Sequence, residues 1–209
     1  MPSSWHSSVT AIFTESPELA VEFATVLGGA RLPGELPVRV EAPDFTGCPA
    51  ADFRADAVIV AGTASDPVRA VMVEAEKRTL RDRPRQWARC AAELWIFLRC
   101  PVDVLVVCPD AKSAFWYARP VPTTLPGYTL RPVVLSPSAV PAMTSSAETS
   151  ARPALAALSV ACHGASPAAR RAFADGMRQL PGDRAARYRE HAVNLAPLAV
   201  RRLLQQPSP

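Results

Sequence analysis

The sequence is poor in lysine and has neither paired cysteines nor a long hydrophobic run. Only Lys77 and Lys112 are lysines among 23 basic residues, an arginine-rich usage for which a GC-rich genome is the simpler explanation. The five cysteines are odd in number and form no C-x-x-C pair, which argues against a disulfide framework and against a structural zinc site. We therefore expect them to be small buried apolar residues.

Features that would direct the chain to a membrane or out of the cell are also missing. No apolar run approaches the roughly 18 to 20 residues that a membrane-spanning helix needs. The N-terminus has no basic segment followed by an apolar one, so no secretory signal is visible. By default we expect a cytoplasmic protein without a membrane partner. Hydrophobic residues make up 49% of the chain and its net charge is +4, which predicts a globular protein and allows a nucleic-acid partner without requiring one.

The sequence contains only three histidines, and no Ser/His/Asp or Cys/His arrangement stands out from their spacing. His163 precedes Gly164 at a predicted helix end, where an imidazolium suits the helix dipole and the free carbonyls. For a set of six aromatic residues we expect a place in the core rather than a base-stacking platform. These are Trp87, Trp95, Phe97, Phe115, Trp116 and Tyr117.

Carboxylates do stand out, at the ends of two strand-like apolar runs. Asp56 opens the first run, and Glu74 and Glu76 end the second, with a turn-rich cluster at 62–67 between them that predicts a hairpin. In an antiparallel pair the start of one strand lies beside the end of the next, and side chains two residues apart face the same way. Three carboxylates could then converge on one hard cation such as Mg²⁺. The alternative is that they are solvated strand ends, paired with Arg54 or Arg78.

The remaining pattern predicts an α/β core followed by helices. We expect residues 1–137 to form the core, residues 138–152 a linker or loop, and residues 153–209 a helical extension packed on the core. The elements predicted for the core are one or two helices in 7–27 that stop at Gly28-Gly29, strands at 36–45, 54–60, 71–78, 102–108 and 131–135, and helices at 84–99 and 111–118. Those predicted for the extension are helices at about 153–163, 167–180 and 183–205, broken at Gly164, Pro181-Gly182 and Pro197.

This order of elements and acids resembles the PD-(D/E)XK nuclease-like superfamily. The nearer resemblance is to its Rpn-like, transposase-associated branch and to uncharacterised actinobacterial relatives. It is carried by segments 53–58 and 70–76, by the helix with Trp87 near its start and by the strand in 100–110, and it covers roughly residues 5–205. The resemblance implies a helix, a three-stranded meander, a helix and a strand, with a mixed central sheet flanked by helices.

The resemblance also implies roles for individual residues. Asp56 and Glu74 would hold Mg²⁺ or Mn²⁺, with Glu22 on the first helix as a further acid. Glu76 occupies the position where the superfamily usually has Lys, or Gln in the nearer relatives. A glutamate there adds repulsion unless a cation is bound. Lys77 is adjacent, but on a continuous strand it would point to the opposite face.

The resemblance favours a Mg²⁺-dependent DNA endonuclease that hydrolyses phosphodiester bonds. DNA would lie near a basic cluster at the start of the helix after the acid motif. The alternative explanation for that cluster is a solvated helix face. Glu76 motivates the alternative of a catalytically inactive relative that acts as a binding module or forms a homo-oligomer through the helical extension. A nucleic-acid binder without cleavage is a third hypothesis. The basic cluster consists of Arg81, Arg83, Arg85 and Arg89.

Overall fold

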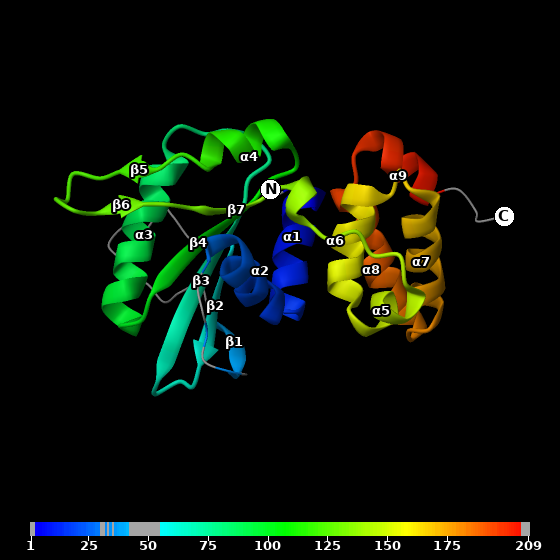
Figure 1. Ribbon diagram of the computed structural model, residues 1–209, viewed down its shortest axis with the longest axis horizontal. Helices are drawn as coiled ribbons and strands as arrows, with labels where there is room; N and C mark the ends of the chain where they lie inside the picture. Colours follow the sequence, from blue (N-terminus) through cyan, green and yellow to red (C-terminus); the bar gives the residue numbers. More distant parts are fainter. Residues whose placement is uncertain (1–2, 30–31, 33, 35, 42–54, 206–209) are drawn as a thin grey trace. The chain divides into compact units, whose positions relative to one another are not determined.

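A computed structural model describes residues 3–29, 32, 34, 36–41 and 55–205 of the 209-residue chain (Figure 1). These residues form an α/β protein with a five-stranded mixed sheet and a set of C-terminal helices. Cys48, Arg54 and the part of the predicted first strand beyond residue 41 lie outside the described residues.

The chain divides into two compact units. Residues 13–136 form the sheet unit, and residues 1–12 together with 137–209 form the helical unit. Helix α1 (Ser4–Glu15) contributes to both units, because its first nine residues belong to the helical unit and Phe13 packs edge-to-face against Phe23 of the sheet unit. The first residues of the chain therefore belong with its C-terminal part, which the pattern of the sequence did not reveal.

The order of elements in the sheet unit follows the prediction closely. Helix α2 ends at the predicted glycine stop, where Gly29 adopts a left-handed conformation with φ of 70°. The small β5–β6 hairpin was not predicted, because strands of two residues are too short to show a period. The elements are α2 (Glu18–Gly28), β1 (Val38–Glu41), β2 (Ala57–Gly62), β3 (Pro67–Ala75), α3 (Arg83–Leu98), β4 (Val102–Val107), α4 (Ala111–Tyr117), β5 (Val121–Pro122), β6 (Thr129–Leu130) and β7 (Val133–Leu135).

The main sheet has the strand order β1-β2-β3-β4-β7. The first three strands are antiparallel neighbours, whereas β4 and β7 run parallel to β3. The predicted hairpin is confirmed, since β2 pairs with β3 and Ala57 lies opposite Val73. This register places Asp56, the residue before β2, beside the last residues of β3.

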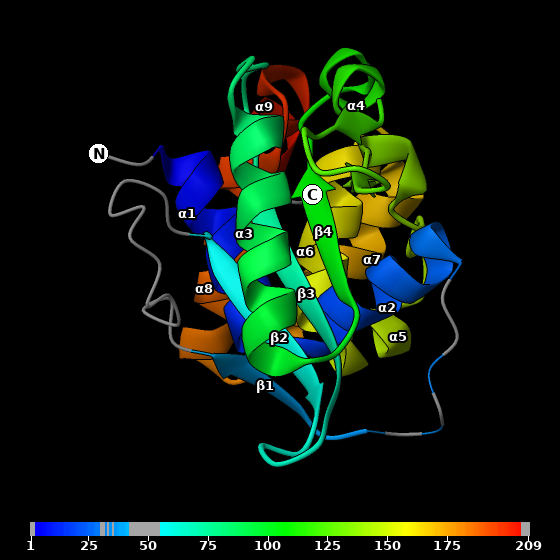
Figure 2. The same ribbon diagram turned by 90° about the vertical axis from the view of Figure 1, so that its left-hand side faces the viewer.

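Helices cover both faces of this sheet. One face carries alternate residues such as Val58, Met72 and Val104, which pack with Trp87 and Leu94 of α3. Helix α2 lies on the other face, as both ribbon views show (Figures 1 and 2). Burial on both faces explains why β2 and the end of β3 are nearly continuous apolar runs. A carboxylate on the α3 face of β3 is therefore held in an apolar layer.

The helical unit matches the predicted helices, with one addition. The segment 138–152, expected as a linker or loop, carries the end of a 3-10 turn (Pro137–Ala139) and helix α5 (Ser146–Ala151), whose N-cap Ser145 accepts from the backbone N–H of Glu148. Arg201 donates to three carbonyls at the end of α8, and these contacts stabilise the turn at Pro197 between α8 and α9. The other helices are α6 (Pro153–His163), α7 (Pro167–Arg178), α8 (Gly182–Leu195) and α9 (Leu198–Leu204).

Polar contacts tie this unit together. The hydroxyl Oγ of Ser8 on α1 lies 3.2 Å from both His191 Nδ1 and Asn194 Nδ2 on α8. His163 ends α6, and its Nε2 lies 2.7 Å from the carbonyl oxygen of Val140. The contact with a carbonyl agrees with the structural role predicted for this histidine.

The close approach of α5 to α7 depends on Gly176. A Cβ atom there would lie 2.5 Å from Thr149 Cγ2 and 3.0 Å from the carbonyl oxygen of Ser146. We expect Gly176→Ala to lower the free energy of unfolding by about 1–3 kcal/mol, because overpacking outweighs the better helix propensity of alanine. Urea denaturation measures the change. The control is Gly182→Ala at an open position, and equal stability of the two variants would contradict the prediction.

Candidate carboxylate site

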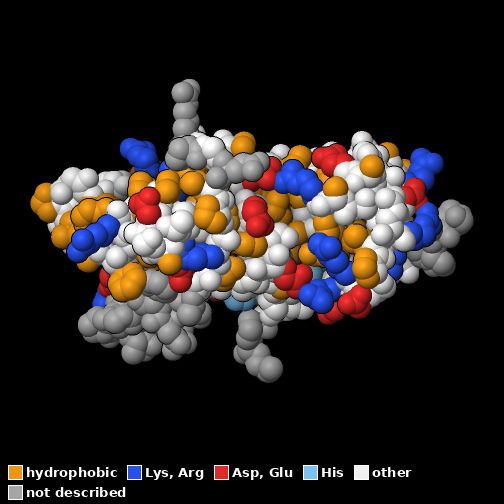
Figure 3. All heavy atoms as spheres, turned by 90° about the horizontal axis from the view of Figure 1, so that it is seen from below, with side chains coloured by type: hydrophobic (Ala, Val, Ile, Leu, Met, Phe, Trp, Pro, Cys, Tyr) orange, Lys and Arg blue, Asp and Glu red, His pale blue; other side chains and the backbone are white. Residues whose placement is uncertain are grey.

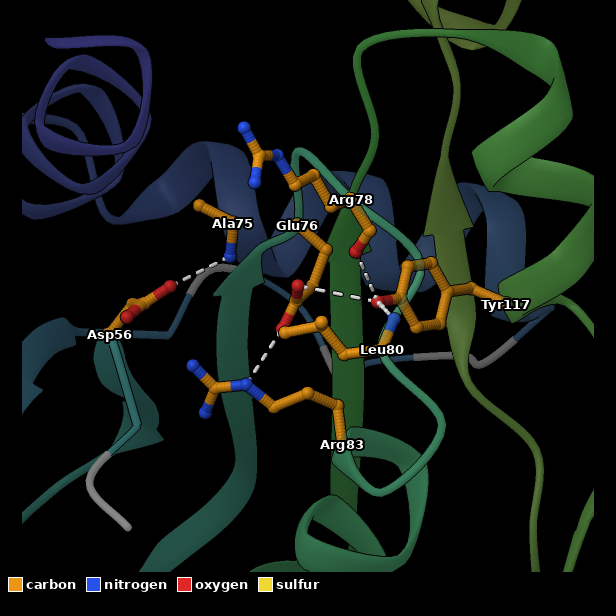
Figure 4. A network of polar contacts seen from close by, with 7 residues as sticks. All are labelled: Asp56, Ala75, Glu76, Arg78, Leu80, Arg83 and Tyr117. Carbon is orange, nitrogen blue, oxygen red and sulfur yellow. Dashed lines mark hydrogen bonds and ion pairs between the residues drawn. The ribbon is translucent and has the colours of Figure 1, made fainter. Parts of the chain in front are cut away.

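The first carboxylate of the site belongs to Asp56. It precedes β2, and its Oδ2 accepts a hydrogen bond of 2.8 Å from the backbone N–H of Ala75 at the end of β3 (Figure 4). The contact confirms that the start of β2 lies beside the end of β3. Asp56 is thus placed within electrostatic reach of Glu74.

Glu74 is the second carboxylate, and it is almost completely buried. Its exposed fraction is 1%, and on β3 it alternates with Met72 to face α3. Within the described part of the chain, Glu74 Oε1 and the indole Nε1 of Trp87 are buried atoms without a hydrogen-bond partner of normal geometry. A buried polar atom without a hydrogen bond lowers the stability of the folded state by about 1–3 kcal/mol. The Glu74 side chain therefore destabilises the fold unless another group binds its Oε1.

The charge state of Glu74 follows from its surroundings. Burial raises the pKa of Glu74 well above its usual value, and the charges of Asp56 and, to a smaller extent, Glu76 raise this pKa further. The Arg83 guanidinium and the Trp87 indole oppose the shift in the pKa. Glu74 therefore tends to keep its proton unless another positive charge is bound nearby.

Glu76 is the third carboxylate, and two side chains hold it. Its exposed fraction is 5%; its Oε1 lies 3.2 Å from Arg83 Nε, and its Oε2 accepts from the hydroxyl of Tyr117 at 3.3 Å (Figure 4). The position where the resemblance implies Lys or Gln thus contains an acid whose charge Arg83 offsets. Arg83 acts on Glu74 as well, so one guanidinium serves two carboxylates.

Lys77 and Glu22 lie differently from these three acids. Strand β3 ends at Ala75, and Lys77 is exposed in the bend that follows, where the alternation of a strand no longer governs its direction. Glu22 is exposed on α2, and neither residue is among the charges that shift the pKa of Glu74. The structure gives no support to Glu22 as a further acid of the site.

The expected group of three ligands is not assembled. Among residues 3–29, 32, 34, 36–41 and 55–205, no three His, Cys, Asp or Glu side chains are placed to hold a metal ion together. Asp56 and Glu74 still fit Mg²⁺ or Mn²⁺ as a pair, because they offer hard oxygen donors and one of these, Glu74 Oε1, is a buried atom lacking a partner. Mg²⁺ commonly binds through one or two carboxylates and keeps several waters.

The predicted basic cluster is only partly available to a ligand. Arg83 contacts Glu76, and Arg89 forms an i,i+4 pair with Glu93 at 3.1 Å, whereas Arg81 and Arg85 are exposed. On the face shown in Figure 3, basic side chains are interspersed with acidic and hydrophobic ones. The electrostatic case for a nucleic-acid surface on that face is therefore weak.

The aromatic residues predicted for the core divide into two groups. Trp87 and Tyr117 are buried and Trp116 is half-buried, but Trp95, Phe97 and Phe115 have exposed fractions of 59%, 63% and 74%. The prediction was wrong for these three. In α3 the buried stripe continues from Trp87 through Leu94 to Leu98, and positions 95–97 fall outside it.

The cysteines in the described residues are free thiols. Cys90, Cys100 and Cys108 are buried and Cys162 is partly buried, which agrees with their predicted role as small apolar residues. Burial raises the pKa of Cys108 to about 12 and that of Cys162 to about 11. Since the thiolate is the reactive form, these two thiols are unsuited to nucleophilic catalysis.

Sequence reasoning missed two contacts that define the site. The sequence predicts that Arg83 belongs to a solvated face or contacts DNA, whereas in the structure it is paired with Glu76 and its charge acts on Glu74. Tyr117 was placed in the core, but its hydroxyl reaches across to Glu76 from an element 41 residues later. The only signal for Arg83 was its place at the start of the predicted helix, and nothing local pointed to the hydroxyl of Tyr117.

The fold and the site together define an α/β protein in which the half-buried Asp56 at the start of β2 lies beside the buried Glu74 at the end of β3. Comparisons with protein-family models, curated proteins and solved structures find no match to this chain. No helix among the described residues is long and apolar enough to span a membrane.

Proposed function

We propose that this protein is a Mg²⁺-dependent DNA endonuclease of the PD-(D/E)XK type, with Asp56 and Glu74 as its metal ligands. The observation that carries the proposal is Glu74, a buried carboxyl group whose Oε1 has no hydrogen-bond partner among the described residues and whose pKa is raised by the charge of Asp56. Repulsion from the Asp56 carboxylate, together with burial, disfavours the ionised form of Glu74. A bound cation would remove that repulsion and satisfy the oxygen.

The arrangement of the elements supports this proposal. Helix α2, the meander β1-β2-β3, helix α3 and strand β4 follow one another in the order that the resemblance implies. The acids occupy the implied positions, at the start of the second strand and the end of the third. A fold alone does not determine an activity, so the proposal depends on the carboxylate pair.

The side chains divide the work as follows. Asp56 and Glu74 would hold the metal ion, which when bound would lower the pKa of a coordinated water and neutralise charge on the scissile phosphate. Arg83 supplies the positive charge that Lys would otherwise bring to the third motif position, and Glu76 keeps the guanidinium in place. We assign this role to Arg83 rather than to the exposed Lys77. In this scheme the exposed Arg81 and Arg85 contact the DNA backbone, whereas Arg89 stays paired with Glu93.

Cleavage of supercoiled plasmid tests the proposal. We expect nicked or linear DNA with Mg²⁺ or Mn²⁺ and none with EDTA. Asp56→Asn should slow cleavage by at least about 100-fold, since even indirect contacts to metal ligands are worth 10- to 100-fold. The control is Asp175→Asn, the same chemical change in the helical unit. Metal-dependent nicking that survives Asp56→Asn would sink the assignment.

A second candidate function is a catalytically inactive nuclease-like protein that acts as a binding or oligomerisation module. It is favoured by the engagement of Glu76 with Arg83 and Tyr117 and by the lack of a three-ligand group in the described residues. This alternative would be supported if calorimetry detects no Mn²⁺ binding and light scattering shows a defined homo-oligomer. A salt-dependent gel shift without cleavage would indicate a nucleic-acid binder instead.

A further inference from the structure

Tyr117, the last residue of α4, is held firmly in the sheet unit. Its exposed fraction is 1%, and its ring packs against Trp87 and Trp116 with centroid distances of 5.0 and 4.7 Å. The hydroxyl points toward the segment that follows β3 (Figure 4). Because the ring is fixed by packing on two sides, the hydroxyl oxygen has a defined position.

That hydroxyl makes three contacts with one short segment. It accepts from the backbone N–H of Leu80 at 3.1 Å, and it lies 2.8 Å from the carbonyl oxygen of Arg78 and 3.3 Å from Glu76 Oε2. A phenol has one proton to donate, so Arg78 and Glu76 share it. The hydroxyl therefore determines both the path of the backbone and the direction of the Glu76 carboxylate.

Residues 76–82 need such a contact. They belong to neither a strand nor a helix, and Arg83 begins α3 immediately after them. Backbone groups outside strands and helices must find other partners, and the Tyr117 hydroxyl provides these for the carbonyl of Arg78 and the N–H of Leu80 in partly buried contacts. The position of Arg83 beside Glu76 and Glu74 depends on where this segment runs.

We infer that Tyr117 is a positioning residue of the carboxylate site, which it organises by holding Glu76 and residues 78–80 so that Arg83 lies beside Glu74. The inference rests on the proposed function, because positioning has meaning only if the site reacts. Tyr117 itself touches neither metal nor substrate in this scheme, and it acts through Glu76 and Arg83.

The test compares Tyr117→Phe with Tyr128→Phe. Both variants keep an aromatic ring and lose one hydroxyl. The hydroxyl of Tyr128 donates to the carbonyl of Ala88 at 2.7 Å, so the control loses a contact with α3, the helix that Arg83 begins. Hydrogen exchange should accelerate about tenfold at the Leu80 amide in Tyr117→Phe, since the amide loses its partner. The control should leave this amide unchanged. Unchanged exchange in Tyr117→Phe would overturn the inference.

The second measurement is a double-mutant cycle in DNA cleavage. We expect Tyr117→Phe to lower kcat about tenfold with KM nearly constant, and Glu76→Gln to have a similar effect. The double variant should be no slower than either single one, because both changes release Arg83. Additive effects would show that Tyr117 has only a structural role. A wild type that does not cleave in the presence of metal overturns the proposed function and this role with it.

Discussion

Replacing Glu74 by glutamine is expected to abolish Mn²⁺ binding and to slow DNA cleavage by at least about 100-fold. Loss of a group that only supports a metal ligand already costs up to about 100-fold, so loss of a ligand should cost at least as much. Glutamine has nearly the same shape as glutamate but no charge, so it fits the space against Trp87. It removes the anion that, with Asp56, attracts the cation. The measurements are isothermal titration with Mn²⁺ and the initial rate of plasmid nicking.

The matched control for this change is Glu190→Gln. Glu190 is exposed on α8 in the helical unit, so the same loss of one carboxylate there should leave both metal affinity and cleavage unchanged. Circular dichroism of both variants checks that the fold is retained. If Glu74→Gln still binds Mn²⁺ as tightly as the wild type, the carboxylate pair is not the metal site.

The second large effect concerns the pH dependence of stability in metal-free protein. Glu74 has a raised pKa in the folded state, whereas in the unfolded chain it titrates near its ordinary value of about 4.3. The folded protein therefore binds the extra proton above that pH. Its free energy of unfolding falls as the pH rises from about 4.3 toward the raised pKa, and the full contribution is present only below about 4.3.

Urea denaturation in EDTA between about pH 5 and 8 measures this effect. The stability difference between wild type and Glu74→Gln should change by up to about 1.4 kcal/mol per pH unit, to the disadvantage of the wild type at high pH. Glu190→Gln should follow the wild type. A parallel pH dependence of wild type and Glu74→Gln would contradict the raised pKa of the Glu74 carboxyl.

Metal binding should show the opposite trend with pH. A carboxylate must lose its proton to bind a cation, so metal binding releases a proton and tightens as the pH rises. Titrations in buffers of different ionisation enthalpy should therefore give a net release of protons that Glu74→Gln lacks. Mg²⁺ should also restore at about pH 8 the stability that deprotonation of Glu74 removes.

Local patterns in the sequence were sufficient for most elements of the fold. Alternating and continuous apolar residues predicted β2, β3 and β4, and glycine and proline marked the ends of α2 and the break before α9. Such signals act through the backbone of a few neighbouring residues, so they can be read without tertiary structure. The hairpin of β2 and β3 can also be predicted from such local signals. Because these strands are antiparallel neighbours, Asp56 and Glu74 lie close together.

Contacts between distant segments could not be predicted in this way. The burial of Glu74 depends on Trp87 and α3, and the pairing of Glu76 depends on Arg83 and on Tyr117 from α4. Placement of α1 partly with the C-terminal helices is a further example. These three features depend on which helix and sheet surfaces pack together. The apolar periodicity within one segment contains no information about that packing.

The amino-acid sequence by itself determined the order of the elements, the hairpin and the presence of acids at its open end, because backbone preferences and apolar periodicity are local properties. Only the tertiary structure decided that Glu74 is buried with one oxygen atom lacking a partner among the described residues, that Glu22 stays on the surface, and that Glu76 is paired with Arg83. Desolvation and charge pairing arise from neighbours in space, so they exist only once the chain has folded.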